Sequence, residues 1–405
     1  MKYLYLSAFL LLFSMCKNPE KEQHFTIKDL DVNIDFAVKQ SILMGDLLAD
    51  STNIFPRTAD ENGNLLTIGG YWWTTGFFPG SLWLLYAETK DENLKTLADK
   101  LSSELAPLQF STDNHDIGWI INSSFGNSYR INENRHDADV ILQTAKSLIT
   151  RYSSTVGSIR SWDKSDRSEK NGWDFIVNID NMMNLELLTT AYRISSDAVF
   201  LQIAIEHADK TLKNHFRSDN SSYHVVDYDT LTGEARKKQT VQGYADDSSW
   251  ARGQAWGLYG FTMMYRETGK QRYLDQAKLI AEFIVNHPRL PNDKIPYWDF
   301  DAPDIPNANK DASAAAIICS ALIELSQYVD NRLSAKYMSV AKQQLKSLSS
   351  PAYQAKLGEN ACFILKHSVG AFPANSEVDV PLIYADYYYV EAMIRLKNIY
   401  LRNLK

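Results

Sequence analysis

Two aspartates stand where an aromatic-rich chain passes from a loop into a helical stretch. Asp116 lies in Asn-His-Asp-Ile-Gly-Trp, and Asp180 lies in Val-Asn-Ile-Asp-Asn-Met-Met-Asn. A carboxylate at such a junction is commonly a helix N-cap, but apolar surroundings can also tune its pKa for proton transfer. For the two aspartates together, the sequence leaves both interpretations open. Paired carboxylates are the usual tools of sugar hydrolysis.

The segment 241–260 combines an arginine with tryptophans and small residues. It contains Gln242, Trp250, Arg252 and Trp256, and its glycines allow a backbone to approach another surface closely. Arginine beside tryptophan suits a flat, anionic, partly apolar ligand, because the guanidinium binds a carboxylate and the indole stacks on a ring. A buried helix start with one satisfied arginine is the equally supported alternative.

Other kinds of catalytic site find little support in the motifs. The sequence has no Gly-x-Ser-x-Gly nucleophile elbow, no phosphate-binding glycine loop and no His-Glu-x-x-His. The run His-Asp-Ala-Asp at 136–139 offers metal-ligand types, but it opens an amphipathic helix, where Asp caps well. We therefore expect no metal and no cofactor.

Composition narrows the partners. The 405 residues carry a net charge of -7, which disfavours nucleic acid because that partner needs a basic face. Aromatic residues make up 12% of the chain, which fits both carbohydrate recognition and an ordinary large core. An anionic small substrate stays possible, since one local arginine can outweigh a mildly acidic surface. The oligomeric state is left open.

The first residues read as an export signal. Residues 1–16 have a positive start and a short apolar run before Cys16, which resembles a lipoprotein signal with a lipidated cysteine; plain secretion is the alternative. We expect a polar tether over 17–32, a catalytic unit over 33–405, and a periplasmic or outer-membrane location. Cys319 and Cys362 are expected to be buried free thiols, although a disulfide between them stays open.

The elements that must position these residues follow a loose internal repeat. Apolar residues recur at three- and four-residue steps, whereas strand-like alternation is scarce. Four segments read as helical hairpins, three others supply single helices, and 223–229 is a candidate strand of a short β-hairpin. The hairpins are expected at 80–105, 182–215, 254–287 and 311–348, and the single helices at 35–49, 136–152 and 383–401.

Long loops rich in aromatic residues separate these hairpins, and loops of that length are usually functional or disordered. Their aromatic content argues against disorder. We therefore expect an all-α fold, a closed (α/α)6 barrel of six helical hairpins with its long loops at one mouth, and at most a short β-hairpin among those loops.

Several motifs, taken in order, make the interpretation specific. They resemble those of the unsaturated glucuronyl hydrolases, which make up glycoside hydrolase family 88, from residue 35 to the C-terminus. The family's fold is a closed barrel of six helical hairpins, which agrees with the repeat above. The motifs are WTTGFFPG at 73–80, HDIG at 115–118, IRSW at 159–162, IDNMMN at 179–184, QGYADD at 242–247, SEVDV at 376–380 and YADYY at 384–388.

The resemblance implies a reaction. The substrate would be an oligosaccharide left by a polysaccharide lyase, with a 4,5-unsaturated uronate at its non-reducing end. Asp180 would protonate carbon 4, and the ionised Asp180 would deprotonate the water that adds to carbon 5. This role requires a protonated Asp180, so its pKa is expected to be raised. Asp116 would hold the ring hydroxyls and influence that proton.

The resemblance also implies binding roles. Trp73, Trp162 and Trp256 would form aromatic walls, His224 and Gln242 would contact the sugar, and Arg252 is the candidate partner of the substrate carboxylate. His115 and Ser368 complete the expected set of binding residues, Ser368 lying in a loop that lines the neighbouring sugar site.

One departure concerns the neighbouring sugar. Members that act on sulfated glycosaminoglycans often carry a lysine just after Gly370, and here Ala371 follows. The expected partner is therefore an unsaturated uronyl oligosaccharide of the ulvan or glycosaminoglycan type. Two other functions stay open: a polysaccharide lyase that uses Arg252 and His224, and a non-catalytic glycan-binding lipoprotein.

Overall fold

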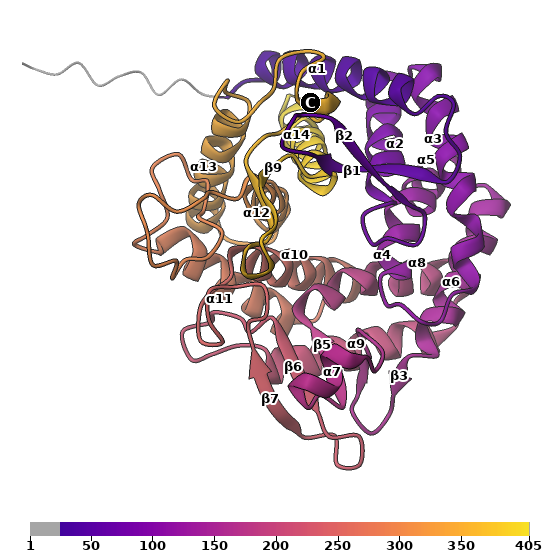
Figure 1. Cartoon of the computed structure of the whole chain (residues 1–405), viewed down its shortest axis with the longest axis vertical. Coiled ribbons are helices and arrows are strands. Elements are labelled where there is room, and N and C mark those ends of the chain that lie inside the picture. The colour runs from indigo at the N-terminus through magenta and orange to yellow at the C-terminus, as the bar shows by residue number, and fades with distance from the viewer. Residues whose placement is uncertain (1–24, 405) are drawn as a thin grey trace, which may run out of the picture.

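The computed structural model describes residues 25–404, so the expected signal segment and Cys16 lie outside the described residues. The chain is mainly helical, and Figure 1 shows its helices arranged around the middle of the molecule. The longer helices are α1 (Ile27–Leu47), α2 (Phe77–Thr89), α3 (Glu92–Leu105), α6 (Arg135–Ile149), α8 (Leu185–Ser195), α9 (Ala198–Asn214), α10 (Ala251–Thr268), α11 (Gln271–Asn286), α12 (Ala312–Leu325), α13 (Asn331–Leu348) and α14 (Ile383–Asn403).

All four expected helical hairpins are confirmed: α2 with α3, α8 with α9, α10 with α11, and α12 with α13. Aspartates begin the second helix of three of them. The side chains of Asp91, Asp197 and Asp330 accept hydrogen bonds from main-chain N–H groups of α3, α9 and α13. Local capping chemistry therefore helps to fix where these three hairpins bend.

The helices differ in how much of their surface is covered. α12 is buried on nearly every side, and so is most of α10, whereas α3, α11 and α13 bury one stripe each. A helix that is apolar all round must be covered all round. Contacts run from α2 to α14, to α12, to α10 and to α8, so the early helix α2 and the last helix α14 lie side by side (Figure 1).

Short helices and strands connect these hairpins and carry the loops. They include α4 (Ile117–Ile121), α5 (Asn127–Asn132), α7 (Asp166–Asn171) and the 3-10 helix η3 (Ile179–Asn184). The strands are β1 (Ile54–Ala59), β2 (Leu65–Gly69), β3 (Tyr152–Ser153), β4 (Ser158–Ile159), β5 (Phe175–Asn178), β6 (Val225–Tyr228), β7 (Ala235–Gln239), β8 (Ser368–Ala371) and β9 (Ser376–Val380).

These strands correct one prediction. The described residues contain four small antiparallel sheets, β1–β2, β3–β4, β5–β6–β7 and β8–β9, where at most a short β-hairpin was expected. The expected hairpin exists as β6–β7, but β5 joins it from a distant part of the chain. Strands of two to six residues are too short to show clear alternation, and all four residues of β5 are buried.

The first helix begins inside the segment 17–32 that was expected to be a tether. α1 begins at Ile27, because Thr26 and Asp29 form a capping box in which each side chain accepts from the other residue's main-chain N–H. Residues 27–32 are therefore helical. Cys319 and Cys362 are free and buried, as expected. Within residues 25–404, no helix is long and apolar enough to cross a membrane.

An ion-pair cluster joins the helices away from the long loops. Glu186 of α8 lies 3.0 Å from Arg130 and 2.5 Å from Arg266, and Arg266 and Arg395 both pair with Glu324 at 2.8 Å. Burial raises the pKa of Glu186, but Arg266 and the other arginines outweigh it and lower the pKa to about 2. The folded protein therefore favours the ionised carboxylate.

Glu186 should make the free energy of unfolding depend on pH in the acid range. A folded-state pKa below the unfolded value contributes stability that is present above pH ~4.5 and is lost as the pH falls towards ~2. We expect Glu186→Gln to lower the free energy of unfolding by ~3 kcal/mol at pH 7 and by much less at pH 3. Urea unfolding at both pH values measures this. The exposed Glu61→Gln is the control, and equal losses at both pH values would contradict the prediction.

Candidate active site

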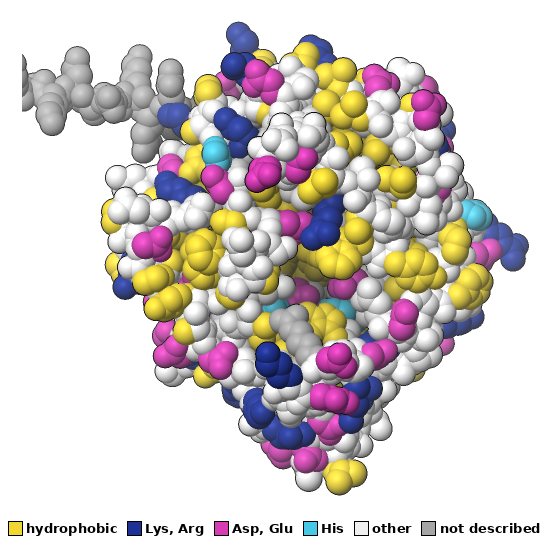
Figure 2. Space-filling view, in the orientation of Figure 1, with side chains coloured by type: hydrophobic (Ala, Val, Ile, Leu, Met, Phe, Trp, Pro, Cys, Tyr) yellow, Lys and Arg dark blue, Asp and Glu magenta, His cyan; other side chains and the backbone are white. Residues whose placement is uncertain are grey.

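The long loops meet over a cavity of about 90 Å³. Figure 2 shows the hollow near the middle of this face, with acidic and histidine side chains at its floor. Nine of the ten predicted site residues line it, together with two tryptophans that were not predicted as site residues. Its lining consists of Trp73, His115, Asp116, Trp119, Trp162, Asp180, His224, Gln242, Trp250, Arg252 and Trp256.

Strand pairing positions Asp180. It is the second residue of η3, which follows β5 directly, and β5 pairs with β6. The N–H of Ile179 donates to the carbonyl of His224 at 2.8 Å, so Asp180 and His224 sit at adjoining strand ends. As a result, Oδ1 of Asp180 lies 3.6 Å from Nε2 of His224.

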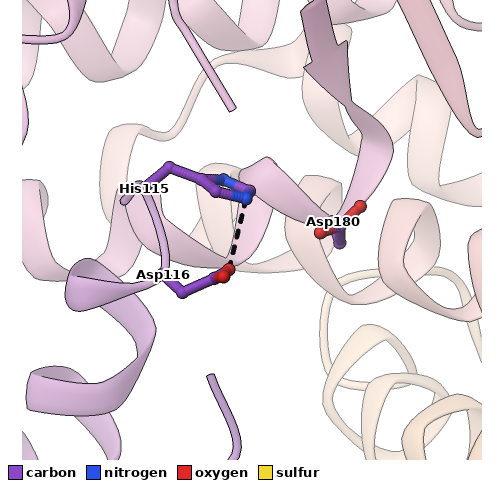
Figure 3. A group of neighbouring side chains, drawn as sticks. All are labelled: His115, Asp116 and Asp180. Carbon is purple, nitrogen blue, oxygen red and sulfur yellow. Dashed lines mark ion pairs between the residues drawn. The ribbon is translucent and has the colours of Figure 1, made fainter. Parts of the chain in front are cut away.

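Asp116 comes from a different loop. It precedes α4, and its main-chain N–H donates to the side chain of Asn114 at 2.8 Å. Its carboxylate makes no capping hydrogen bond to α4 but faces His115, whose Nε2 is 3.2 Å from Oδ1 of Asp116 (Figure 3). Asp180 does not cap η3 either, because Asn178 occupies that position. The capping interpretation is therefore wrong for both aspartates.

Two polar atoms in the cavity are buried without a hydrogen-bond partner among the described residues. They are Nε2 of His115, whose side chain is 1% exposed, and Oδ1 of Asp180. Leaving such atoms unsatisfied costs about 1–3 kcal/mol each, and natural proteins rarely do so without a functional reason. Nε2 of His115 can therefore donate to a polar ligand in the cavity, and Oδ1 of Asp180 can accept from one.

The two carboxyl groups have opposite pKa directions. Burial raises the pKa of Asp116, and the nearby Asp180 raises it further, against the lowering effect of His115. Burial also acts to raise the pKa of Asp180, but the hydrogen bond and charge of His224, with the charge of His115, bring it below its usual value. The expectation of a raised pKa for Asp180 is wrong for the ligand-free site, since the sequence did not reveal His224 beside it.

Arg252 is held by the protein. Its terminal nitrogens donate to Asp311 at 3.2 Å, to Gln242 at 3.0 Å, and to the carbonyls of Val369 and Gly370. Its guanidinium also lies 4.6 Å from the ring centre of Trp250. This is the satisfied, buried arginine that the sequence left open as an alternative. Direct pairing with a substrate carboxylate stays a prediction.

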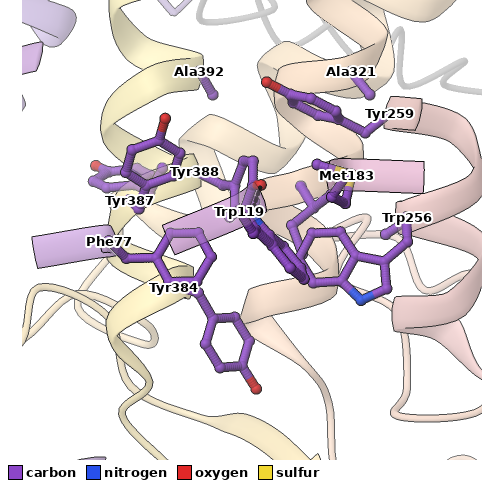
Figure 4. Close-up of a cluster of buried hydrophobic side chains, with 14 of the residues drawn as sticks. Phe77, Trp119, Met183, Trp256, Tyr259, Ala321, Tyr384, Tyr387, Tyr388 and Ala392 are labelled. Carbon is purple, nitrogen blue, oxygen red and sulfur yellow. Dashed lines mark hydrogen bonds between the residues drawn. The ribbon is translucent and has the colours of Figure 1, made fainter. Parts of the chain in front are cut away.

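Aromatic rings form the wall and floor of the cavity. Trp119 of α4 and Trp256 of α10 meet edge to face at 4.6 Å, and Trp73 lies 5.3 Å from Trp119. Figure 4 shows Trp119 between Trp256 and the tyrosines Tyr384, Tyr387 and Tyr388 of α14. Trp119 was missed although it follows the HDIG motif directly. Trp250, whose ring lies tilted at 4.7 Å from the ring of His224, belongs to the segment 241–260 singled out above.

Ser368 is the one predicted site residue that the structure does not bring to the cavity lining. It begins β8, and its side chain is fully buried with no hydrogen-bond partner for Oγ among the described residues. Its backbone neighbours Val369 and Gly370 hold Arg252 instead. β8 thus contacts the site through main-chain carbonyls.

The chemistry of the donors decides how well the cavity suits a metal ion. His115, Asp116 and Asp180 each offer one ligand atom, and these atoms lie within 4.8 Å of one another. However, Nδ1 of His115 already lies 3.2 Å from the amide nitrogen of Asn184, and Nε2 faces Asp116. A metal-binding histidine needs a lone pair directed at the ion. The group fits an acid–base pair better than a metal centre.

Comparison with known proteins identifies the family. The sequence profile of Glycosyl Hydrolase Family 88 matches residues 51–399. The chain is 47% identical over 331 residues to an unsaturated glucuronyl hydrolase of Formosa agariphila, covering 82% of this chain and 81% of that protein.

Solved structures agree. The crystal structure of an unsaturated glucuronyl hydrolase specific for heparin is 44% identical, with a TM-score of 0.89, and covers 94% of this chain and 100% of that one. A mutant unsaturated glucuronyl hydrolase from Streptococcus agalactiae, complexed with dGlcA-GalNAc6S, is 29% identical with a TM-score of 0.77 and 93% coverage of both chains. The cavity described above therefore lies in an enzyme fold, and this chain belongs to glycosyl hydrolase family 88.

Proposed function

We propose that this glycoside hydrolase removes the 4,5-unsaturated uronic acid from the non-reducing end of lyase-generated oligosaccharides, with Asp180 as the general acid and base. One observation carries the proposal. Asp180 is buried in the aromatic cavity with its Oδ1 3.6 Å from Nε2 of His224, and a carboxylate oxygen of Asp116 lies within 4.8 Å of a carboxylate oxygen of Asp180. The activity of the family's relatives supports the substrate class.

The reaction is a hydration of the vinyl ether. Asp180 donates a proton to carbon 4, and positive charge develops at carbon 5 and the ring oxygen. A water molecule adds to carbon 5 and gives its proton to the ionised Asp180, which restores the starting state. The hemiketal then opens to a ketone at carbon 5, and the exposed hemiacetal at carbon 1 releases the rest of the saccharide.

The two carboxyl groups act as a coupled pair. Like charges this close favour one shared proton, and in the ligand-free site the pKa of Asp116 is the higher of the two. A bound uronate brings another negative charge and displaces water from the cavity, and both effects raise the pKa of Asp180. The proton required at carbon 4 would thus reach Asp180 only when substrate is present.

Ultraviolet absorbance of the substrate double bond tests this function. With lyase-generated disaccharides, the hydrolase consumes the absorbance and releases one free sugar per double bond lost. A polysaccharide lyase acting on intact polymer would create the absorbance, and a glycan-binding lipoprotein would leave it unchanged. Either of those outcomes would overturn the proposal.

We propose an ulvan- or glycosaminoglycan-type fragment as the substrate. The relatives specific for heparin or complexed with dGlcA-GalNAc6S support a glycosaminoglycan, whereas Ala371 after Gly370 supports a neighbouring sugar that needs no lysine there. A panel of disaccharides with and without sulfate, compared by kcat/KM, separates the two.

Two further proposals concern architecture and location. The packing of α2 on α14 supports a closed (α/α)6 barrel, since it joins an early helix to the last one.

The apolar run before Cys16 supports export to the periplasm or anchoring in the outer membrane through a lipidated cysteine. Mass spectrometry of the mature N-terminus separates lipidation from plain secretion.

A further inference from the structure

The helix that carries Asp180 also carries two fully buried asparagines. Asn181 and Asn184 follow Asp180 in η3, and both have 0% exposed surface. Nδ2 of Asn184 donates to Oδ1 of Asn181 at 2.9 Å. Buried amides at an active site must satisfy both of their ends, so their partners define which end is oxygen and which is nitrogen.

Main-chain groups fix the orientation of both amides. Oδ1 of Asn184 accepts from the N–H of Trp119 at 2.8 Å, and a main-chain N–H can only donate. Nδ2 of Asn181 donates to the carbonyl of Ile159 at 2.8 Å, and a carbonyl can only accept. Flipping either amide would set donor against donor or acceptor against acceptor.

This orientation determines the tautomer of His115. Nδ2 of Asn184 lies 3.2 Å from Nδ1 of His115. Because the asparagine nitrogen donates, Nδ1 must accept and therefore carries no proton. A neutral imidazole has one N–H, so the proton sits on Nε2. That Nε2 atom belongs to the cavity lining and lies 3.2 Å from Oδ1 of Asp116.

A glycine makes the close approach of Asn184 possible. A Cβ atom at Gly118 would lie 2.8 Å from both Cβ and Oδ1 of Asn184, too close for any real side chain. Gly118 stands between His115 and Trp119, and Asn184 of η3 contacts both of these residues. The arrangement therefore depends on residues of both the HDIG and IDNMMN motifs.

We propose that Asn184 is a positioning residue that holds His115 as the neutral Nε2–H tautomer, so that His115 presents a fixed hydrogen-bond donor to an oxygen of the substrate and to Asp116. This rests on the proposed function only for the identity of that oxygen. A cationic His115 would instead favour the ionised form of Asp116 and remove the proton that the carboxyl pair needs.

The surroundings show why such a device is required. The titratable groups that act on His115 are Asp116 beside it, Asp180 on η3 and His207 on α9. Burial lowers the pKa of His207 to about 3, so His207 is neutral at working pH. The ring of His115 thus lies beside two carboxyl groups and a neutral histidine, and the N–H of Asn184 occupies Nδ1 as a donor.

Nitrogen NMR of the wild-type protein tests the tautomer without any activity measurement. In protein labelled with ¹⁵N-histidine, His115 is assigned by its loss in His115→Gln. We expect an unprotonated Nδ1 and a protonated Nε2. An Nδ1–H tautomer would overturn the proposal even if the enzyme is active.

Asn184→Asp tests the consequence, because its carboxylate replaces the donor that faces Nδ1 by an acceptor. We expect Nδ1 of His115 to become protonated and kcat to fall about tenfold or more with a smaller change in KM. Asn398→Asp, which adds the same charge at an exposed site on α14, is the control.

Gly118→Ala provides a second variant that alters no polar group. It should displace Asn184 and release the His115 tautomer, so its NMR signals should resemble those of Asn184→Asp. Wild-type kcat and an unchanged Nδ1 signal in Asn184→Asp would overturn the proposal. If neither variant folds, the wild-type spectrum still decides it, whereas failure of the proposed hydrolase function would appear only in the absorbance assay.

Discussion

Asp180→Asn is expected to lower kcat by about 10³-fold or more while the protein stays folded and still binds its substrate. The amide has nearly the shape of the carboxyl group, but it cannot give a proton to carbon 4 or take one from water. Losing a positioned general acid and base costs about 10²–10⁴-fold for each role, and Asp180 is proposed to serve both. Its nearest charged neighbour is His224, whose Nε2 lies 3.6 Å from Oδ1, and an amide oxygen at the same place can still accept from that ring.

Absorbance kinetics measure kcat, calorimetry with a disaccharide measures binding, and circular dichroism against temperature measures the fold. Asp247→Asn is the matched control, because it makes the same change at an exposed aspartate of the loop that precedes α10. The control should keep kcat within a factor of about two, since surface substitutions rarely matter. A wild-type kcat in Asp180→Asn would contradict the proposed mechanism.

The sequence predicted what depends on local pattern. Helical periodicity predicted the four hairpins, and the aspartates that begin the second helix of three of them are visible as Asp91, Asp197 and Asp330. Capping acts within a few residues, so its signal survives in the sequence alone. The site residues followed from motifs, and nine of the ten line one cavity.

What depends on distant contacts was not predictable. β5 is four residues long and pairs with a strand far along the chain, and that pairing is what brings His224 to Asp180. The lowered pKa of Asp180 is a consequence of this contact, so the error in the pKa follows from the missed strand. A charge effect between residues cannot be assigned before their separation is known.

Arg252 shows a related limit. Its type and neighbours suggested a ligand-binding arginine, but the structure supplies protein acceptors for its terminal nitrogens from α12 and β8. Asp311 caps α12 through Ser313 and also reaches Arg252 at 3.2 Å. The pair therefore links helix α10, the start of α12 and strand β8 behind the cavity.

Arg252→Met should consequently destabilise the protein by ~3–5 kcal/mol, because it leaves the fully buried carboxylate of Asp311 without its counter-charge. It should also raise KM, since Gln242 and the carbonyl of Gly370 lose the donor that holds them at the cavity. Losing one charge-assisted hydrogen bond corresponds to about 1.5–3 kcal/mol of binding. Urea unfolding and absorbance kinetics measure the two effects.

A double-mutant cycle separates the ion pair from simple loss of packing. Asp311→Asn keeps the cap on α12, because asparagine caps as well as aspartate, but it removes the buried charge. Arg252→Met combined with Asp311→Asn should therefore cost less than the two single losses added together. Arg135→Met, at a side chain that is 93% exposed, should change stability by less than about 0.5 kcal/mol. If the losses in free energy of unfolding of the two single variants simply add, Arg252 and Asp311 do not stabilise the site as a pair. An unchanged KM in Arg252→Met would show that the contacts of Arg252 do not affect substrate binding.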